Sequence, residues 1–171
     1  MDDKADYLFS SYRERLIEHL FVGEVLRALW LEGIPQVEVL RSEVDGTGYD
    51  VVLGCQAITR HVQLKAARIG GKRASVGINL NLAHKPSGCV VWVYFDPKTL
   101  QLGPFYWFGG APGQPLPSVA HMKVGKHTKG DALGHKAERP NIRLVPKSKF
   151  QKVDTIAELV TCLFGVDKGR T

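Results

Sequence analysis

Apolar residues recur at three- and four-residue steps along the first part of the chain, which is the pattern of an amphipathic helix. They predict a helix over residues 5–33, with an apolar stripe made by Leu8, Tyr12, Leu16, Leu20, Val25, Leu26, Leu29 and Trp30. Gly23 weakens the helix interior, so a break is expected near residues 21–23. Gly33, with Pro35 two residues later, predicts where the helix ends.

Shorter segments with the two-residue alternation of strands follow this helix. Strands are predicted at residues 37–40, 49–55 and 60–67, with the glycine-containing turn Asp45–Gly48 between the first two. Because consecutive strands joined by short connections pair side by side, residues 37–67 are predicted to form an antiparallel meander.

Residues 76–108 are predicted to include the central strand of the fold and the elements on either side of it in sequence. Residues 76–84 fit either a strand or a short helix ended by Pro86, and we predict the helix. Residues 89–95 are apolar at every position, which is typical of a central strand covered on both faces. Residues 102–108 predict a further, aromatic strand.

The last part of the chain combines a basic stretch with a final helix. Residues 121–147 are rich in lysine, arginine and glycine and predict a mobile loop, which leads into a short strand at 141–145. An apolar face over residues 153–164 predicts a helix that begins at Ser148 or Asp154 and stops at Gly165. The chain is then a single α/β domain of the α+β type, residues 1–171, with a core over residues 5–110. Its central mixed sheet is expected to be flanked by helices.

Charge is distributed unevenly along the chain. Residues 1–50 hold 5 Lys/Arg and 11 Asp/Glu, a net charge of −6, whereas residues 51–171 hold 18 and 6, a net charge of +12. A basic part attached to an acidic part suggests that a polyanion binds beside a cluster of carboxylates. Nucleic acid is the obvious polyanion.

Cysteine usage and hydropathy predict a cytoplasmic protein. Cys55, Cys89 and Cys162 are widely spaced in apolar segments, so buried free thiols are expected rather than disulfides. No stretch approaches the roughly 18 apolar residues of a membrane span, so no membrane partner is expected. The acidic start of the chain has neither the basic nor the apolar region of a signal peptide.

Two of the predicted strands carry polar residues that a core strand has no reason to keep. Asp50 lies where the second strand begins, and Gln63 and Lys65 leave the same face of the third strand. A carboxylate, an amide oxygen and an amine on one face are suited to a divalent cation beside a phosphate. The alternative is that Asp50 caps a turn, while Gln63 and Lys65 lie on a solvated face.

The first helix supplies a candidate carboxylate. Glu24 is flanked by Gly23, Val25 and Leu26, which is a less polar setting than that of a typical surface glutamate. Glu18 is expected to be an ordinary solvated helix residue. If Glu24 points away from Asp50, Glu18 or Glu38 is the next candidate.

The order of these elements and residues resembles the PD-(D/E)XK nuclease superfamily. Its members have a core of helix, three-stranded meander, helix and strand, with an aspartate at the second strand and an acid-x-Lys motif on the third. Asp50 and Lys65 match this motif, while Gln63 replaces the acid. The Gln-x-Lys pattern is similar to that of the Mrr-like branch. A glutamate on the first helix, here Glu24, is similar to that of Holliday-junction-resolvase-like members. The resemblance covers residues 16–96, including the glycine-rich run Asp45–Asp50 before the aspartate.

This resemblance implies a restriction-endonuclease-like fold and an endonuclease that hydrolyses phosphodiester bonds in DNA, with less weight on RNA. Its cofactor would be Mg²⁺ or Mn²⁺, which neutralises the phosphate and activates water. The implied ligands are Asp50, the Gln63 amide oxygen, the Leu64 carbonyl and Glu24. Lys65 would either stabilise the developing negative charge or act as a base. Because Gln63 lacks the charge of an acid, an inactive nucleic-acid-binding protein with this fold is the alternative. A protein with no nucleic-acid role is the third hypothesis.

Basic residues around these strands are candidate phosphate contacts, with a solvated loop as the alternative for those in residues 121–147. They are Arg60, Arg68, Lys72, Arg73, Lys123, Lys126, Lys129, Lys136, Arg139 and Arg143. Histidines in the basic stretch have no cysteine partner or regular spacing, so a metal site is not expected there. Many members of the superfamily dimerise, and the run Tyr106-Trp107-Phe108 would suit a homodimer surface, with a core strand as the alternative.

Overall fold

A six-stranded mixed sheet forms the centre of the computed structural model, which describes residues 9–42, 46–127 and 134–166. The strands are β1 (Val37–Arg41), β2 (Val51–Cys55), β3 (Ile58–Arg68), β5 (Gly88–Phe95), β6 (Leu102–Gly109) and β9 (Gln151–Val153), in the order β1-β2-β3-β5-β6-β9. Neighbours are antiparallel except β3 and β5, which are parallel. The predicted meander and the fully buried central strand β5 are therefore confirmed.

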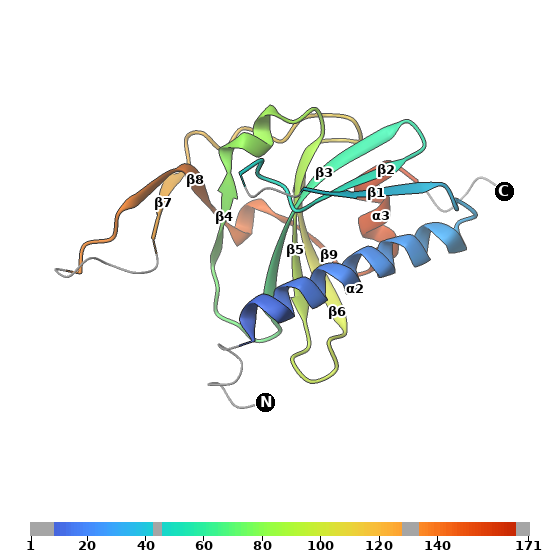
Figure 1. The fold of residues 1–171 in the computed structure, drawn as a ribbon, viewed down its shortest axis with the longest axis horizontal. Coiled ribbons are helices and arrows are strands. Elements are labelled where there is room, and N and C mark those ends of the chain that lie inside the picture. The colour runs from blue at the N-terminus through green and yellow to red at the C-terminus, as the bar shows by residue number, and fades with distance from the viewer. Residues whose placement is uncertain (1–8, 43–45, 128–133, 167–171) are drawn as a thin grey trace.

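Two helices cover one face of this sheet (Figure 1). Helices α2 (Ser10–Leu31) and α3 (Ile156–Phe164) share one core cluster with that face, to which Phe21, Val91 and Leu159 contribute fully buried side chains. The predicted central mixed sheet with flanking helices is confirmed, with both helices on the same face. The nuclease resemblance implies the order helix, three-stranded meander, helix and strand. The chain has α2, the meander β1-β2-β3 and then β5, and the helix between β3 and β5 is only a short 3₁₀ helix at residues 80–84.

Helix α2 is continuous, so the expected break at residues 21–23 is wrong. A glycine inside a helix costs only about 1 kcal/mol, and the buried neighbours Phe21, Val22 and Val25 offset it by packing on the sheet. The predicted end is confirmed: Gly33 has φ +75°, and the N–H of Ile34 donates to the carbonyl of Leu29 at 2.9 Å.

A second sheet covers the other face of the central one. It has three strands in the order β4-β8-β7, namely β4 (Ser75–Asn79), β8 (Glu138–Pro146) and β7 (Lys123–Lys126). Val76, Ile78 and Val145 of this sheet are buried in one cluster with Val90 and Trp92 of β5. The central sheet is therefore buried on both faces, which explains the unbroken apolar sequence of β5.

The segment between the parallel strands contains both structures that its sequence fits. Residues 75–79 form β4, and residues 80–84 form the 3₁₀ helix η1 (Leu80–His84). The predicted short helix is thus confined to the second half of the segment. Asn79 caps η1 by accepting a hydrogen bond from the N–H of Asn81 at 3.0 Å.

Parts of the basic stretch of residues 121–147 are strands instead of the predicted mobile loop. These strands form the hairpin of β7 and β8, which projects away from the central sheet (Figure 1). β8 also pairs with β4 along five residues and buries Val145, and this pairing orders a segment whose composition indicated a loop. The predicted strand at 141–145 is confirmed within the longer β8. Lys129 lies outside the described residues.

The final helix begins later than predicted because other elements occupy the residues before it. Residues 147–149 form the 3₁₀ turn η2 (Lys147–Lys149), and residues 151–153 form β9 at the edge of the central sheet. Thr155 caps α3 by accepting from the N–H of Glu158 at 3.2 Å. The helix stops at Gly165 with φ +70°, as predicted.

The run Tyr106-Trp107-Phe108 contributes to the core, as the alternative of a core strand predicted, and the homodimer stays a prediction. Trp107 is buried in the cluster beneath the helices, and Tyr106 and Phe108 pack against the cluster beneath the second sheet. The three cysteines are free thiols as expected, with Cys55 and Cys89 buried and Cys162 half-buried. Within the described part of the chain, no helix has the length and apolar character needed to cross a membrane.

Candidate active site

A cavity of about 530 Å³ lies between the N-terminal half of α2 and the central sheet, and we call it the Asp50 cavity. It takes side chains from α2, from the connection between β1 and β2, from β3 and from β5. The lining residues are Ser11, Glu14, Arg15, Ile17, Glu18, Ser42, Tyr49, Asp50, Leu64, Lys65, Ala66, Arg73 and Val93. The structure therefore brings the predicted Asp50 and Lys65 together, along with two glutamates of the helix.

Asp50 is anchored to β3 just before β2 begins. Its N–H donates to the carbonyl of Val62 at 2.9 Å, and its Oδ2 accepts from the N–H of Leu64 at 2.6 Å. Because β2 does not extend back past Val51, the carboxylate takes the donor that an earlier strand residue would have used. The N–H and C=O of one strand residue point to the same side, so the Leu64 carbonyl also faces the Asp50 side of β3.

Gln63 and Lys65 share the face of β3 that the strand register also gives to Asp50. Gln63 is buried and does not line the cavity, since its Oε1 accepts from the N–H of Asn79 at 3.3 Å. The amide thus ties β3 to the cap of η1. Another link runs from η1 to the turn before Asp50, where Asn81 Nδ2 donates to the carbonyl of Gly46 at 2.8 Å.

Three of the described lysines have a shifted pKa. The pKa of Lys65 is lowered from its ordinary value, whereas those of Lys147 and Lys152 are raised. Burial is the main cause and lowers the pKa of Lys65 from 10.5. The carboxylates of Asp50 and Glu14 oppose this shift, whereas the guanidinium groups of Arg139 and Arg73 reinforce it. Lys65 therefore lies within the electrostatic reach of two acids and two bases.

The helix contributes Glu14 and Glu18 to the cavity instead of the predicted Glu24. Glu14 and Glu18 are four residues apart, so they lie on one face of α2. Glu24 does not line the cavity: its Oε2 accepts from Arg27 Nη2 at 2.7 Å, and its side chain is 40% exposed. The helix turns Glu24 away because the buried face at this level is formed by Val25 and Phe21.

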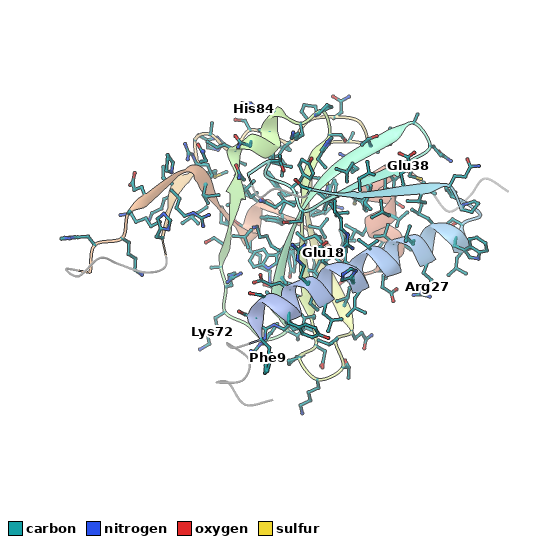
Figure 2. All side chains as sticks on the ribbon, viewed as in Figure 1. Phe9, Glu18, Arg27, Glu38, Lys72 and His84 are labelled. Atoms are coloured by element: carbon teal, nitrogen blue, oxygen red, sulfur yellow. The ribbon has the colours of Figure 1, made fainter. Side chains whose placement is uncertain are left out.

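Glu18 is buried between two arginines rather than solvated as expected. Its side chain is 8% exposed, and its Oε2 accepts from Arg15 Nη1 at 3.1 Å. Its Oε1 lies 3.1 Å from Arg41 Nη1 and forms an ion pair with it. The angles of this contact are not those of a hydrogen bond, so the buried Oε1 accepts none within the described structure. Figure 2 shows Glu18 where α2 crosses the strands, well apart from Glu38 on β1. Glu38 does not line the cavity.

The donor atoms around the cavity are of the chemical type that a hard divalent cation takes. Carboxylate oxygens come from Asp50, Glu14 and Glu18, and the Leu64 carbonyl faces the same region. Mg²⁺ takes oxygen ligands and is commonly held by one or two carboxylates together with waters and substrate phosphates. Over the described residues no three His, Cys, Asp or Glu side chains converge on one point, and this also covers His121, His127 and His135.

Arg60 is not a phosphate contact, contrary to its prediction. It is completely buried, and its guanidinium donates to the carbonyls of Leu163, Cys162 and Gly110. Burial lowers the pKa of Arg60. Its positive charge, which was expected at the surface, instead lies at the carbonyls of the C-terminal end of α3.

The other predicted phosphate contacts differ in their exposure. Arg73 lines the cavity. Its side chain is exposed, as are the side chains of Lys72, Lys123, Lys126, Lys136 and Arg139. Arg143 is half-buried and donates to the carbonyls of Ala120 and Pro140, so much of its hydrogen-bonding capacity is used within the hairpin. Arg68 is half-buried at the end of β3.

No protein-family model matches the sequence, and no curated protein sequence matches it significantly. Among solved structures, the chain is similar to Hjc from Archaeoglobus fulgidus, a Holliday junction resolvase from an archaeal hyperthermophile. The two share 14% sequence identity with a TM-score of 0.41, and the match covers 83% of this chain and 98% of that one.

Proposed function

We propose that this protein is a metal-dependent endonuclease that hydrolyses phosphodiester bonds in DNA, with RNA as the second substrate to test. The observation that supports this best is the Asp50 cavity, in which Asp50 and Lys65 from adjacent strands meet Glu14 and Glu18 from the helix. Carboxylates that bind a cation and a lysine beside them are what phosphodiester hydrolysis requires.

Asp50, the Leu64 carbonyl and Glu14 are the groups proposed to hold Mg²⁺ or Mn²⁺ in this cavity. Such a cation, when bound, neutralises phosphate charge and lowers the pKa of a coordinated water. The hydrogen bond from Leu64 N–H to Asp50 Oδ2 fixes the carboxylate. Glu18 is ion-paired to Arg15 and Arg41, and the pair with Arg41 joins α2 to β1 next to Glu14. Gln63 is assigned to positioning, because its amide oxygen binds Asn79.

Lys65 is proposed to act on the phosphate and the attacking water. Its lowered pKa leaves two roles open in chemical terms: an ammonium that stabilises negative charge on the phosphate, or an amine that takes a proton from water. The ammonium role fits the neighbouring carboxylates, which favour the charged form. We therefore propose that Lys65 acts as an ammonium that donates to a non-bridging phosphate oxygen.

Basic side chains next to the cavity are proposed to bind the nucleic-acid backbone. Arg73 lines the cavity, and Arg139 lies close enough for its charge to lower the pKa of Lys65. Further out, the hairpin of β7 and β8 carries Lys123, Lys126 and Lys136 as exposed charges. Contacts of this kind go to phosphates and give affinity without base specificity.

An inactive nucleic-acid-binding protein is the second candidate function. It is favoured by Gln63, which stands where the superfamily has an acid and whose oxygen is bound to Asn79. Loss of that negative charge weakens cation binding, while the basic hairpin is unaffected. Both candidates predict salt-dependent binding to nucleic acid, and they differ in turnover.

Cleavage of plasmid, single-stranded DNA and RNA by the purified protein tests the proposal. Reactions contain Mg²⁺, Mn²⁺ or EDTA, and the variants Asp50→Ala and Lys65→Ala are assayed beside the wild type. We expect cation-dependent cleavage that both substitutions abolish. Cleavage that persists in either variant would rule out this cavity as the active site, and binding without cleavage by the wild type would select the second candidate.

A further inference from the structure

Lys147, a residue outside the site described above, has its ammonium group held against three aromatic rings. Its Nζ lies 4.1 Å from the ring centroid of Tyr106, 4.4 Å from that of Tyr94 and 5.9 Å from that of Trp92. The rings contact one another, with centroids 5.3 Å apart for Tyr94 and Tyr106 and 5.6 Å apart for Trp92 and Tyr94. We call this arrangement the Lys147 cage. A cation over several ring faces is attracted by each of them.

The Lys147 cage lies beside the Asp50 cavity. The N–H of Lys147 donates to the carbonyl of Ala74 at 2.9 Å, and the residue before Ala74 is Arg73, which lines the cavity. In the central sheet Lys65 is paired with Trp92, and Trp92 with Tyr106, so these side chains share one face. Since adjacent strands are about 4.8 Å apart, the cage begins one strand from Lys65.

The cage keeps its lysine charged and presents it to solvent. Burial lowers the pKa of Lys147, but the Tyr106 and Tyr94 hydroxyls outweigh it, so the pKa is raised overall. Within the described residues, no carboxylate forms an ion pair with Lys147. The side chain itself is only half-buried. A fixed ammonium with no acidic partner is suited to bind an anion, because little side-chain entropy is left to lose.

A buried polar atom of the cage gives a second indication of a ligand. Trp92 is completely buried, yet its Nε1 has no hydrogen-bond partner in the described structure. This group can donate a hydrogen bond. Unsatisfied buried donors are uncommon and call for a partner such as water or a bound group.

We propose that the Lys147 cage is a phosphate-binding subsite that anchors the nucleic-acid backbone next to the Asp50 cavity. This inference rests on the proposed nucleic-acid substrate and adds a residue to its binding surface. Lys147 contacts a phosphate near the one cleaved, because its N–H binds the carbonyl of Ala74, whose preceding residue Arg73 lines the cavity. The rings hold the ammonium in place and do not contact the bases themselves.

The test compares Lys147→Met with Lys149→Met, which removes an exposed lysine of the same turn η2 that is not in the cage. Binding to duplex and single-stranded oligonucleotides is measured by fluorescence anisotropy in EDTA at several salt concentrations. Each phosphate contact adds about 0.9 to the salt slope, that is, to the steepness with which log K falls with the logarithm of the salt concentration. We therefore expect the ratio of wild-type to Lys147→Met affinity for duplex DNA to be about eightfold larger at 0.1 M salt than at 1 M salt. Lys147→Arg should retain the wild-type slope, and Lys149→Met should leave it nearly unchanged.

Lysine acetylation followed by mass spectrometry supplies a measurement on the wild-type protein, which avoids any folding defect of a variant. Bound DNA should protect Lys147 more than Lys149. Equal salt slopes for Lys147→Met and Lys149→Met, or equal protection of the two lysines, would overturn the subsite while leaving the nuclease proposal intact. Absence of any salt-dependent binding by the wild type would overturn both.

Discussion

Arg60 and Leu163 are joined across 103 residues of sequence by a hydrogen bond from Arg60 Nε to the Leu163 carbonyl at 2.7 Å. A second donor, Arg60 Nη2, binds the Cys162 carbonyl at 3.1 Å. The last carbonyls of a helix have no partner within it and carry partial negative charge, so a buried cation stabilises them. The guanidinium also lies 5.2 Å from the ring centroid of Trp107. Arg60 thus holds the end of α3 on the central sheet.

Replacement of Arg60 by methionine is expected to destabilise the fold without changing nucleic-acid binding. Carbonyls that lose a charged donor cost about 3 kcal/mol in unfolding free energy, which corresponds to a fall in Tm of roughly 6–12 °C for a domain of this size. Differential scanning calorimetry measures the first effect and anisotropy with duplex DNA the second.

Arg27→Met is the matched control for Arg60, because the Arg27 side chain is 61% exposed and forms an ion pair with the half-exposed Glu24. A surface pair of this kind contributes at most about 1 kcal/mol. A lower salt slope for Arg60→Met, with Tm unchanged, would show that Arg60 reaches the nucleic acid and that its place at α3 is unimportant.

The sequence could not reveal this role of Arg60, because periodicity reports which face a residue takes and not what lies opposite. Arg60 begins a strand that the pattern predicted well, but its partners lie on a helix 102 and 103 residues later. Short-range signals were more reliable: the glycine at the end of α2 and that at the end of α3 both marked the helix ends. The pairing of β8 with β4 could not be predicted from the sequence either, because a composition rich in glycine and lysine predicts a loop.

Glu14→Gln is expected to lower cation-dependent cleavage, whereas Glu24→Gln should leave it unchanged. Glu14 lines the Asp50 cavity and influences Lys65 electrostatically, while Glu24 is bound to Arg27 on the outer side of the helix. The loss for Glu14→Gln should be about tenfold to a hundredfold, the range found for groups that support a metal site. Initial rates across a Mg²⁺ titration measure it.

The opposite ranking, with Glu24→Gln impaired and Glu14→Gln active, would restore the assignment that the sequence favoured. Glu18→Gln needs a separate control, because its carboxylate is buried between Arg15 and Arg41. A variant that loses stability and rate together is informative only after its Tm has been measured.

For the candidate site, the sequence was sufficient for the residues on or next to the strands and insufficient for the helix. Asp50 and Lys65 were singled out because a strand has a period of two and because polar residues stand out in apolar strands. Glu14 was missed, although its spacing of four from Glu18 placed both on one face of α2. The choice of Glu24 relied on its apolar neighbours in sequence, but of these only Val25 is buried, while Leu26 is exposed and lies, like Glu24, on the outer side of the helix.

Charges around Lys65 should move its titration in opposite directions. Arg139→Gln removes a group that lowers the pKa of Lys65 and should raise that pKa, whereas Glu14→Gln removes a group that raises it and should lower it further. Nitrogen-15 NMR of the lysine side chains in metal-free protein measures both shifts. Parallel shifts, or none, would show that Lys65 is not close to these residues.

The same titration is linked to stability with a defined sign. Lys65 has a lower pKa in the folded chain than its ordinary value of 10.5 in the unfolded one, so the unfolded state binds more protons between the two values. The unfolding free energy should therefore rise with pH through this interval, and Lys65→Met should remove the rise. Urea unfolding at a series of pH values up to 10.5 tests this, and an identical pH dependence for the variant would contradict it.

Gln63→Glu examines the residue at which this chain departs from the superfamily motif. The substitution keeps an oxygen able to accept from the N–H of Asn79, so the link to η1 survives. It also adds a buried negative charge on the face of β3 shared with Asp50, which should lower the Tm of the metal-free protein. A divalent cation bound to the variant but not to its unfolded chain relieves this repulsion and stabilises the fold by mass action. The gain in Tm on adding Mg²⁺ should then be larger for Gln63→Glu than for the wild type.

Gln63→Leu, which removes the acceptor and adds no charge, should lose stability with no added response to Mg²⁺. Equal responses in Gln63→Glu and the wild type would mean that residue 63 does not face the cation. The role of Gln63 would then be limited to holding Asn79, and Asp50 with the helix carboxylates would have to bind the metal without help from β3 side chains.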